Sequence, residues 1–153
     1  MVESLIRSSK HKTIEDLLDS FNKSASDGNL ENYFGCFFNE NSRFLGTDEK
    51  ENWTVSEFYD YSFKYFDGTP AWIYIPISGT RTVEIFPSND KPNFATFDEL
   101  LSSKSFNITC RGSGTLIFFS GYWYICSYHL SFPIPNEIAK KLTESIADYS
   151  RAK

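Results

Sequence analysis

Three stretches in the first half of the chain carry apolar residues three or four positions apart, the spacing of one face of a helix. In the first stretch these residues are Ile14, Leu17, Leu18 and Phe21. Thr13 precedes them as a capping residue, and Gly28 follows as a natural stop. A second, short helix is predicted after Asn29. The third opens at Thr54-Val-Ser-Glu57, a capping box in which each side chain satisfies an unpaired backbone amide.

The pattern becomes extended after the third helix. A brief strand is predicted earlier, at 42–45, and residues 72–77 and 81–86 are rich in β-branched and aromatic residues. Residues 94–101 are a further strand candidate, although 97–101 fits the first turn of a helix equally well. The strands follow one another through short turns, which is typical of an antiparallel sheet.

The longest extended stretch predicts a hairpin of residues 111–119 and 122–131, joined at Ser120-Gly121. Pro133 and Pro135 then stop the second strand. Strict alternation puts Trp123, Ile125, Ser127 and His129 on one face of that strand, and Tyr122, Tyr124, Cys126, Tyr128 and Leu130 on the other. Both faces carry large side chains, so the hairpin is expected in the middle of the sheet.

The order of the elements is helices first, then hairpin-connected strands, then one helix. This order predicts an α+β fold with a cone-shaped, curved antiparallel sheet wrapped over the N-terminal helices. The last helix is expected after Asn136, with Ile138, Leu142 and Ile146 on one face. We expect one domain over 1–153, with a flexible lead-in at 1–12, a core fold at 13–136 and the C-terminal helix at 137–150. The hollow between sheet and helices suits a small ligand.

Composition narrows the function classes. Aromatic residues make up 18% of the 153 residues, enough either to fill such a hollow or to line it. The net charge of −5, without a basic stripe, argues against nucleic acid as a partner. Cys36, Cys110 and Cys126 form no C-x-x-C pair, and no apolar run reaches membrane-spanning length. The sequence therefore predicts a cytoplasmic protein with reduced thiols and no membrane partner.

Several short stretches resemble the SnoaL-like branch of the nuclear transport factor 2-like superfamily. They are 44–48 with Trp53, then Arg81, 95–99, 111–114, 123–125 and 128–136. The resemblance implies the cone-shaped fold, and a homodimer joined through the outer face of the sheet. The superfamily includes cyclases, dehydratases, isomerases and epoxide hydrolases as well as non-catalytic association modules. Thr96 stands where the family has a bulky aromatic residue, and no carboxylate aligns with the catalytic positions of the characterised enzymes.

Glu99 and His129 are the candidate catalytic residues. A carboxylate facing an aromatic hollow, or a histidine on a strand face, can act as a general acid or base. The alternatives are a structural ion pair of Glu99 with Arg111 or Arg81, and a buried structural histidine. The two arginines are also candidate ligands for a bound carboxylate or enolate, because a guanidinium binds such groups through two hydrogen bonds.

Asp48, Trp53 and Trp123 complete the candidate ligand-binding residues. The pattern favours a turn residue for Asp48, and core or pocket wall for Trp53. No spacing of His, Cys and Asp fits a metal site, and no cofactor is predicted. Two hypotheses follow. The first is a homodimer that binds a small apolar or carboxylate-bearing ligand, with acid-base lyase or isomerase chemistry. The second is a non-catalytic dimerisation or protein-interaction module whose own Phe and Tyr side chains fill the hollow.

Overall fold

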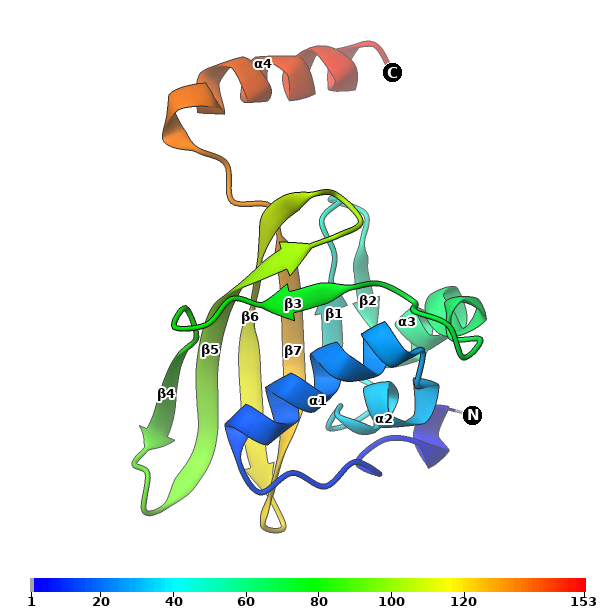
Figure 1. Cartoon of the computed structure of the whole chain (residues 1–153), viewed down its shortest axis with the longest axis vertical. Coiled ribbons are helices and arrows are strands. Elements are labelled where there is room, and N and C mark those ends of the chain that lie inside the picture. The colour runs from blue at the N-terminus through cyan, green and yellow to red at the C-terminus, as the bar shows by residue number, and fades with distance from the viewer. Residues whose placement is uncertain (1) are drawn as a thin grey trace.

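The computed structural model describes residues 2–153 and has the predicted α+β architecture (Figure 1). Helices α1 and α2 cover one face of a curved sheet, α3 lies beside its β1–β2 edge, and α4 stands apart from the body. The helices are α1 (Ile14–Asp27), α2 (Leu30–Gly35), α3 (Val55–Ser62) and α4 (Asn136–Arg151). The strands are β1 (Arg43–Leu45), β2 (Asn52–Thr54), β3 (Tyr74–Pro76), β4 (Thr82–Pro87), β5 (Pro92–Ser103), β6 (Ile108–Phe119) and β7 (Tyr122–Ser131). Short 3-10 turns occur at Val2–Ser4 and Phe63–Tyr65.

Hydrogen bonds confirm both predicted ends of α1 and the predicted start of α3, while α3 ends at Ser62, before the stop expected near Gly68. The hydroxyl of Thr13 accepts the backbone N–H of Asp16 at 3.1 Å, and Gly28 ends the helix with φ of 67°, in the left-handed region. At α3 the Thr54 hydroxyl accepts the N–H of Glu57, while the Glu57 carboxylate accepts the N–H of Thr54. This capping box fixes the direction in which α3 leaves β2.

The sheet runs in the order β2-β1-β7-β6-β5-β3, and β4 also pairs with β5. All pairs are antiparallel except β1 with β7, so the sheet is mixed. The expectation of a purely antiparallel sheet is therefore corrected at this pair. Strands β3 and β4 were expected as a hairpin, but each pairs with a different part of β5. Residues 94–101, whose sequence fits either a strand or a helical turn, lie within strand β5.

A β-bulge at Cys126 changes which residues of β7 share a face. Thr115 pairs with Ser127 and Leu116 with Ile125, so Cys126 is an extra residue on β7. Trp123 and Ile125 face the core before the bulge, and Tyr128 and Leu130 face it afterwards. The predicted alternation was wrong across this point, because His129 falls on the opposite, exposed face.

Aromatic side chains fill the deep part of the cone. Phe21 of α1 stacks on Tyr33 with ring centroids 4.4 Å apart, and Tyr128 reaches Phe21 from the sheet at 4.8 Å. Gly112 on β6 permits this approach, since a Cβ there would lie 2.3 Å from the Tyr128 hydroxyl oxygen. The space left among these rings is about 20 Å³, too small for a ligand.

The two ends of the chain differ in how they pack. Of the expected lead-in, Met1 lies outside the described residues, but Val2 is buried and Arg7 donates a hydrogen bond to the Phe38 carbonyl at 2.6 Å. Helix α4 begins at Asn136 itself, with Pro135 rather than Asn136 at the cap position and no side-chain cap. None of its residues is buried. No helix within residues 2–153 has the length and apolar character needed to cross a membrane.

Candidate functional site

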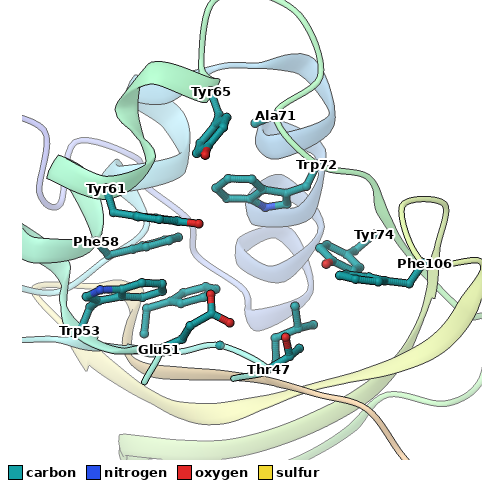
Figure 2. Close-up of a pocket in the computed structure, with 13 residues that line it drawn as sticks. Thr47, Glu51, Trp53, Phe58, Tyr61, Tyr65, Ala71, Trp72, Tyr74 and Phe106 are labelled. Atoms are coloured by element: carbon teal, nitrogen blue, oxygen red, sulfur yellow. The ribbon is translucent and has the colours of Figure 1, made fainter. Parts of the chain in front are cut away.

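An open cavity lies at the end of the cone that α3, the β1–β2 loop and the segment before β3 surround (Figure 2). We call it the aromatic cavity. Its volume is about 260 Å³, just below the roughly 300–1,000 Å³ of pockets for drug-sized molecules. It suits a smaller ligand. It is lined by Phe44, Gly46, Thr47, Glu51, Trp53, Phe58, Tyr61, Tyr65, Ala71, Trp72, Tyr74, Phe106 and Leu130.

One wall of the aromatic cavity is a stack of rings. Trp53 stacks on Tyr61 at 4.7 Å and on Phe58 at 5.4 Å between centroids, and Phe44 stacks beneath Phe58 at 4.0 Å. The capping box at Thr54 turns the chain from the strand that carries Trp53 into the helix that carries Phe58 and Tyr61. Adjacent elements therefore supply the stack, and the structure places Trp53, a predicted site residue, in the cavity wall.

Trp72 lies across the cavity from this stack, with Tyr65 above it and Tyr74 and Phe106 beside it (Figure 2). Trp72 packs behind the cavity on Phe66 and Tyr33, with centroids 5.2 and 5.7 Å away, so the core holds its position. Tyr65 and Phe106 remain 42% and 52% exposed. They therefore form the mouth of the cavity rather than its floor.

Glu51 is the only charged residue among those that line the aromatic cavity. It follows the β1–β2 turn, where the N–H of Gly46 donates to its carbonyl at 2.7 Å. Its carboxylate accepts the N–H of Asp48 at 3.0 Å and points into the space between the ring stack and Tyr74 (Figure 2). A Cβ at Gly46 would lie 2.8–2.9 Å from the Glu51 side chain. Glycine at position 46 thus makes room for the carboxylate.

The phenol groups nearest to Glu51 have altered acidities. Burial raises the pKa of Tyr61, and the charges of Tyr65 and Glu51 raise it further. Burial also raises the pKa of Tyr74, again with a contribution from Glu51. Both hydroxyls therefore stay protonated at neutral pH and can donate hydrogen bonds. The aromatic cavity offers a ligand neutral donors, apolar ring surfaces and a single negative charge.

Glu99 lies elsewhere, on the inner face of β5 against α1. It is 1% exposed, and its carboxylate accepts hydrogen bonds from Arg81 Nε at 2.7 Å and Asn22 Nδ2 at 3.1 Å. Arg81 also binds Asp19 at 2.8 Å and Glu15 at 2.5 Å. Burial lowers the pKa of Arg81, but the hydrogen bonds to Glu99 and Asp19 outweigh it and raise the pKa overall. Three carboxylates thus engage the guanidinium of Arg81.

Arg111 and His129 lie on the outer face of the sheet. Arg111 pairs in register with Leu100, and His129 with Ser113, and both are exposed. Glu99 lies on the opposite, inner face of the same sheet. The structure therefore does not bring Glu99, Arg111 and His129 together, and none of them lines the aromatic cavity. Their catalytic and ligand-binding roles stay predictions.

The two remaining predicted residues lie beside the cavity or apart from it. Asp48 accepts the N–H of Lys50 at 2.9 Å as a turn residue, and its own N–H holds the Glu51 carboxylate. Trp123 is 4% exposed and packs against Phe118 at 5.1 Å, outside the cavity lining. Asp48 thus does not line the aromatic cavity, but its backbone N–H helps to position the Glu51 carboxylate there.

Sequence reasoning missed Glu51. Its position two residues before Trp53, at the entry to β2, would place both side chains on one face of an extended segment. That spacing was a usable signal. The contribution of Tyr74 and Phe106 to the same cavity was not readable, because it depends on how β3 and the β5–β6 turn approach β1 in space.

Comparison with known proteins identifies the family. The model of the SnoaL-like domain family matches residues 14–135, and the chain belongs to this family. No curated protein matches the chain.

Solved structures share the fold. An NTF2-like protein of unknown function from Pseudomonas putida is 13% identical, with a TM-score of 0.60 over 81% of this chain and 87% of that one. One from Shewanella oneidensis is 19% identical, with a TM-score of 0.56 over 78% and 96%. A protein of unknown function from Mycobacterium tuberculosis is 14% identical, with a TM-score of 0.59 over 83% and 73%.

Proposed function

We propose that this SnoaL-like protein binds a small, largely apolar molecule in the aromatic cavity. The observation that carries the proposal is the cavity itself, about 260 Å³ of open space between aromatic rings supplied by separate elements of the fold. A folded protein that leaves such a surface open gains nothing from it in stability, because the same rings would be more stable if packed. Ligand binding is the function that explains the open space.

Binding rather than acid-base catalysis is the better supported activity. Glu99 is 1% exposed, is held by Arg81 and Asn22, and lies outside the lining of the aromatic cavity, so its carboxylate cannot move a proton to a ligand bound there. His129 lies on the outer face of the sheet. Arg81 is engaged by three carboxylates, which leaves it unsuited to a ligand carboxylate. The apolar class of ligand is therefore favoured over the carboxylate-bearing one.

The second candidate function is a non-catalytic dimerisation module with a filled hollow. It is favoured by one observation: the deep part of the cone holds only about 20 Å³ of space, since Phe21, Tyr33 and Tyr128 occupy it. In this case the aromatic cavity would be a surface recess without a ligand. The two candidates differ in whether small molecules bind there.

We also propose a homodimer through the outer face of the sheet, with α4 covering part of the partner. The apolar stripe of α4 has no cover, with Ile138, Leu142 and Ile146 exposed by 50%, 38% and 53%. An isolated helix of 16 residues is marginal in water, so α4 needs a surface to pack on. Antiparallel contact of two α4 helices about Leu142 would set Ile138 near Ile146 of the second copy. The sheet must add area, because one helix pair is smaller than a standard interface.

The unpaired thiols support a reducing, cytoplasmic location. Cys36, Cys110 and Cys126 are all free, and the first two are buried. Burial raises the pKa of Cys36 to about 12, which keeps it a protonated, unreactive thiol. A protein folded in an oxidising compartment would more commonly pair such residues.

Fluorescence tests the binding proposal. In Trp123→Phe the two remaining tryptophans, Trp53 and Trp72, both line the aromatic cavity. We expect hits from a screen of small apolar compounds to change the emission of this variant. Adding Ala71→Leu, which narrows the cavity, should weaken binding by at least about tenfold. Ala152→Leu, on the exposed end of α4, is the matched control and should have no effect. If no compound binds, or if both substitutions act alike, the proposal fails.

A further inference from the structure

The chemistry of the aromatic cavity narrows its ligand, given the proposed function on which this step rests. The walls are rings with electron-rich faces, among them Trp53, Trp72, Tyr61 and Tyr65. Such rings attract organic cations more strongly than they attract neutral molecules of the same shape. A neutral apolar ligand would gain hydrophobic contact with these rings, but not the attraction between a positive charge and their faces.

The charge of the lining points the same way. Glu51 contributes one negative charge, and no Lys, Arg or His is among the residues that line the cavity. Within residues 2–153, Glu51 makes no ion pair, and the hydrogen bond from the Asp48 N–H leaves its carboxylate able to accept more. An anionic ligand would be repelled here, whereas a cation would neutralise a partly buried carboxylate.

An ammonium already contacts two of these rings from within the chain. Lys64 Nζ lies 5.2 Å from the ring centroid of Tyr65 and 6.0 Å from that of Tyr61, within the range of a cation–π contact. Lys64 is exposed and is not part of the lining. The contact of Lys64 with Tyr65 and Tyr61 is of the same kind as the one that a cationic ligand would make with the cavity walls.

We propose that the aromatic cavity binds a small alkylated ammonium compound, with its charged nitrogen between Trp72 and the ring stack and facing Glu51. An alkylated ammonium has few or no N–H groups, so it suits walls of hydrocarbon and aromatic carbon that offer few acceptors. The single carboxylate supplies the counter-charge. The phenol hydroxyl of Tyr74, whose pKa burial raises, stays protonated and can donate to a polar atom elsewhere in the ligand.

Choline and 3,3-dimethyl-1-butanol form a matched probe pair, because they have the same shape and differ in the charge at the central atom. Each compound is titrated into the full chain, and binding is measured from the NMR signals of the Trp53 and Trp72 indole N–H groups. A third compound, 3,3-dimethylbutanoate, is the anionic probe. We expect choline to bind roughly tenfold more tightly than the alcohol, as cation–π and carboxylate contacts together allow, and the anion to bind most weakly.

Glu51→Gln separates charge from shape. Glutamine keeps an oxygen that can accept the Asp48 N–H, so the loop should retain its structure. The preference for choline should fall to about twofold or less, while the affinity for the alcohol is unchanged. Glu49→Gln is the matched control, since Glu49 is exposed in the same loop and does not line the cavity. It should leave the preference intact.

The outcomes separate this inference from the proposed function. Equal affinity for choline and the alcohol, or an equal effect of the Glu49 and Glu51 substitutions, would overturn the ammonium ligand and leave an apolar-ligand site. Binding of the alcohol without binding of choline would overturn it in the same way. Failure of all three probes would also overturn the ammonium ligand. If the fluorescence screen gave no ligand either, the proposed function would fail with it.

Discussion

Arg81→Met is expected to destabilise the protein far more than any substitution of an exposed charge. Glu99 is 1% exposed, and Arg81 is its only ion-pair partner within residues 2–153. Methionine keeps much of the side-chain volume of Arg81 but leaves the buried carboxylate without a cation. Removing one member of a buried pair costs about 3–5 kcal/mol, because the other charge stays desolvated.

That free energy corresponds to a fall in the melting temperature of about 6–20 °C, at roughly 2–4 °C per kcal/mol for a domain of this size. The exposed partners of Arg81 give the comparison. Glu15 and Asp19 side chains are 66% and 64% exposed, so Asp19→Asn should cost no more than about 1 kcal/mol. The free-energy cost of losing the buried contact between Arg81 and Glu99 should therefore be several times that of losing the exposed contact between Arg81 and Asp19.

The double variant Arg81→Met with Glu99→Gln tests the mechanism of this loss. The glutamine is neutral and can still accept the hydrogen bond from Asn22, so the double variant should be more stable than Arg81→Met alone by about 2 kcal/mol or more. Urea unfolding followed by circular dichroism measures the three variants and the unaltered protein. If Arg81→Met costs no more than Asp19→Asn, or if the double variant is the least stable, the buried ion pair does not have the role assigned to it.

Three further predictions concern other parts of the fold. Burial lowers the pKa of His11 against an opposing effect of Asp16, so the unfolded chain binds a proton first as the pH falls below about 6.5. The free energy of unfolding should therefore decline as the pH falls from about 6.5 towards the lowered pKa of His11 in the folded state. Between pH 7 and 5.5 the melting temperature of His11→Gln should decline less than that of the unaltered protein; equal declines would contradict this. Replacing Ile138, Leu142 and Ile146 with serine should shift the proposed dimer towards monomer in analytical ultracentrifugation, and an unchanged dimer would exclude α4 from the interface. Thr54→Ala should cost about 1 kcal/mol in urea unfolding through loss of the cap, and a neutral result would contradict the capping argument.

Local sequence determined the elements well because the relevant contacts are local. The caps at Thr13 and Thr54 and the turn at Ser120-Gly121 all join residues within three or four positions, and each is present in the structure. The face assignment of β7 failed at Cys126, where one extra residue reverses the alternation. A bulge is defined by the register with β6 and β1, which the strand itself does not encode.

The candidate site shows the same division between local and long-range information. Trp53 is predicted from a local stretch, residues 44–48 with Trp53, that resembles the family. Glu99 and Arg81, 18 residues apart, were weighed as a possible ion pair, and they form one. The aromatic cavity combines residues from 44 to 130, and no periodicity in the chain relates them. Its open volume depends on the separation of α3 from β3, a tertiary feature beyond pattern analysis.

The most direct test of the central claim is a map of backbone amide shifts on addition of choline or, should choline not bind, of the best compound from the screen. We expect the largest changes at the β1–β2 loop around Glu51, at α3 around Tyr61 and at Trp72. Changes centred instead on Glu99 in the deep cone, or on Arg111 and His129 on the outer face of the sheet, would contradict the assignment of the aromatic cavity as the ligand site.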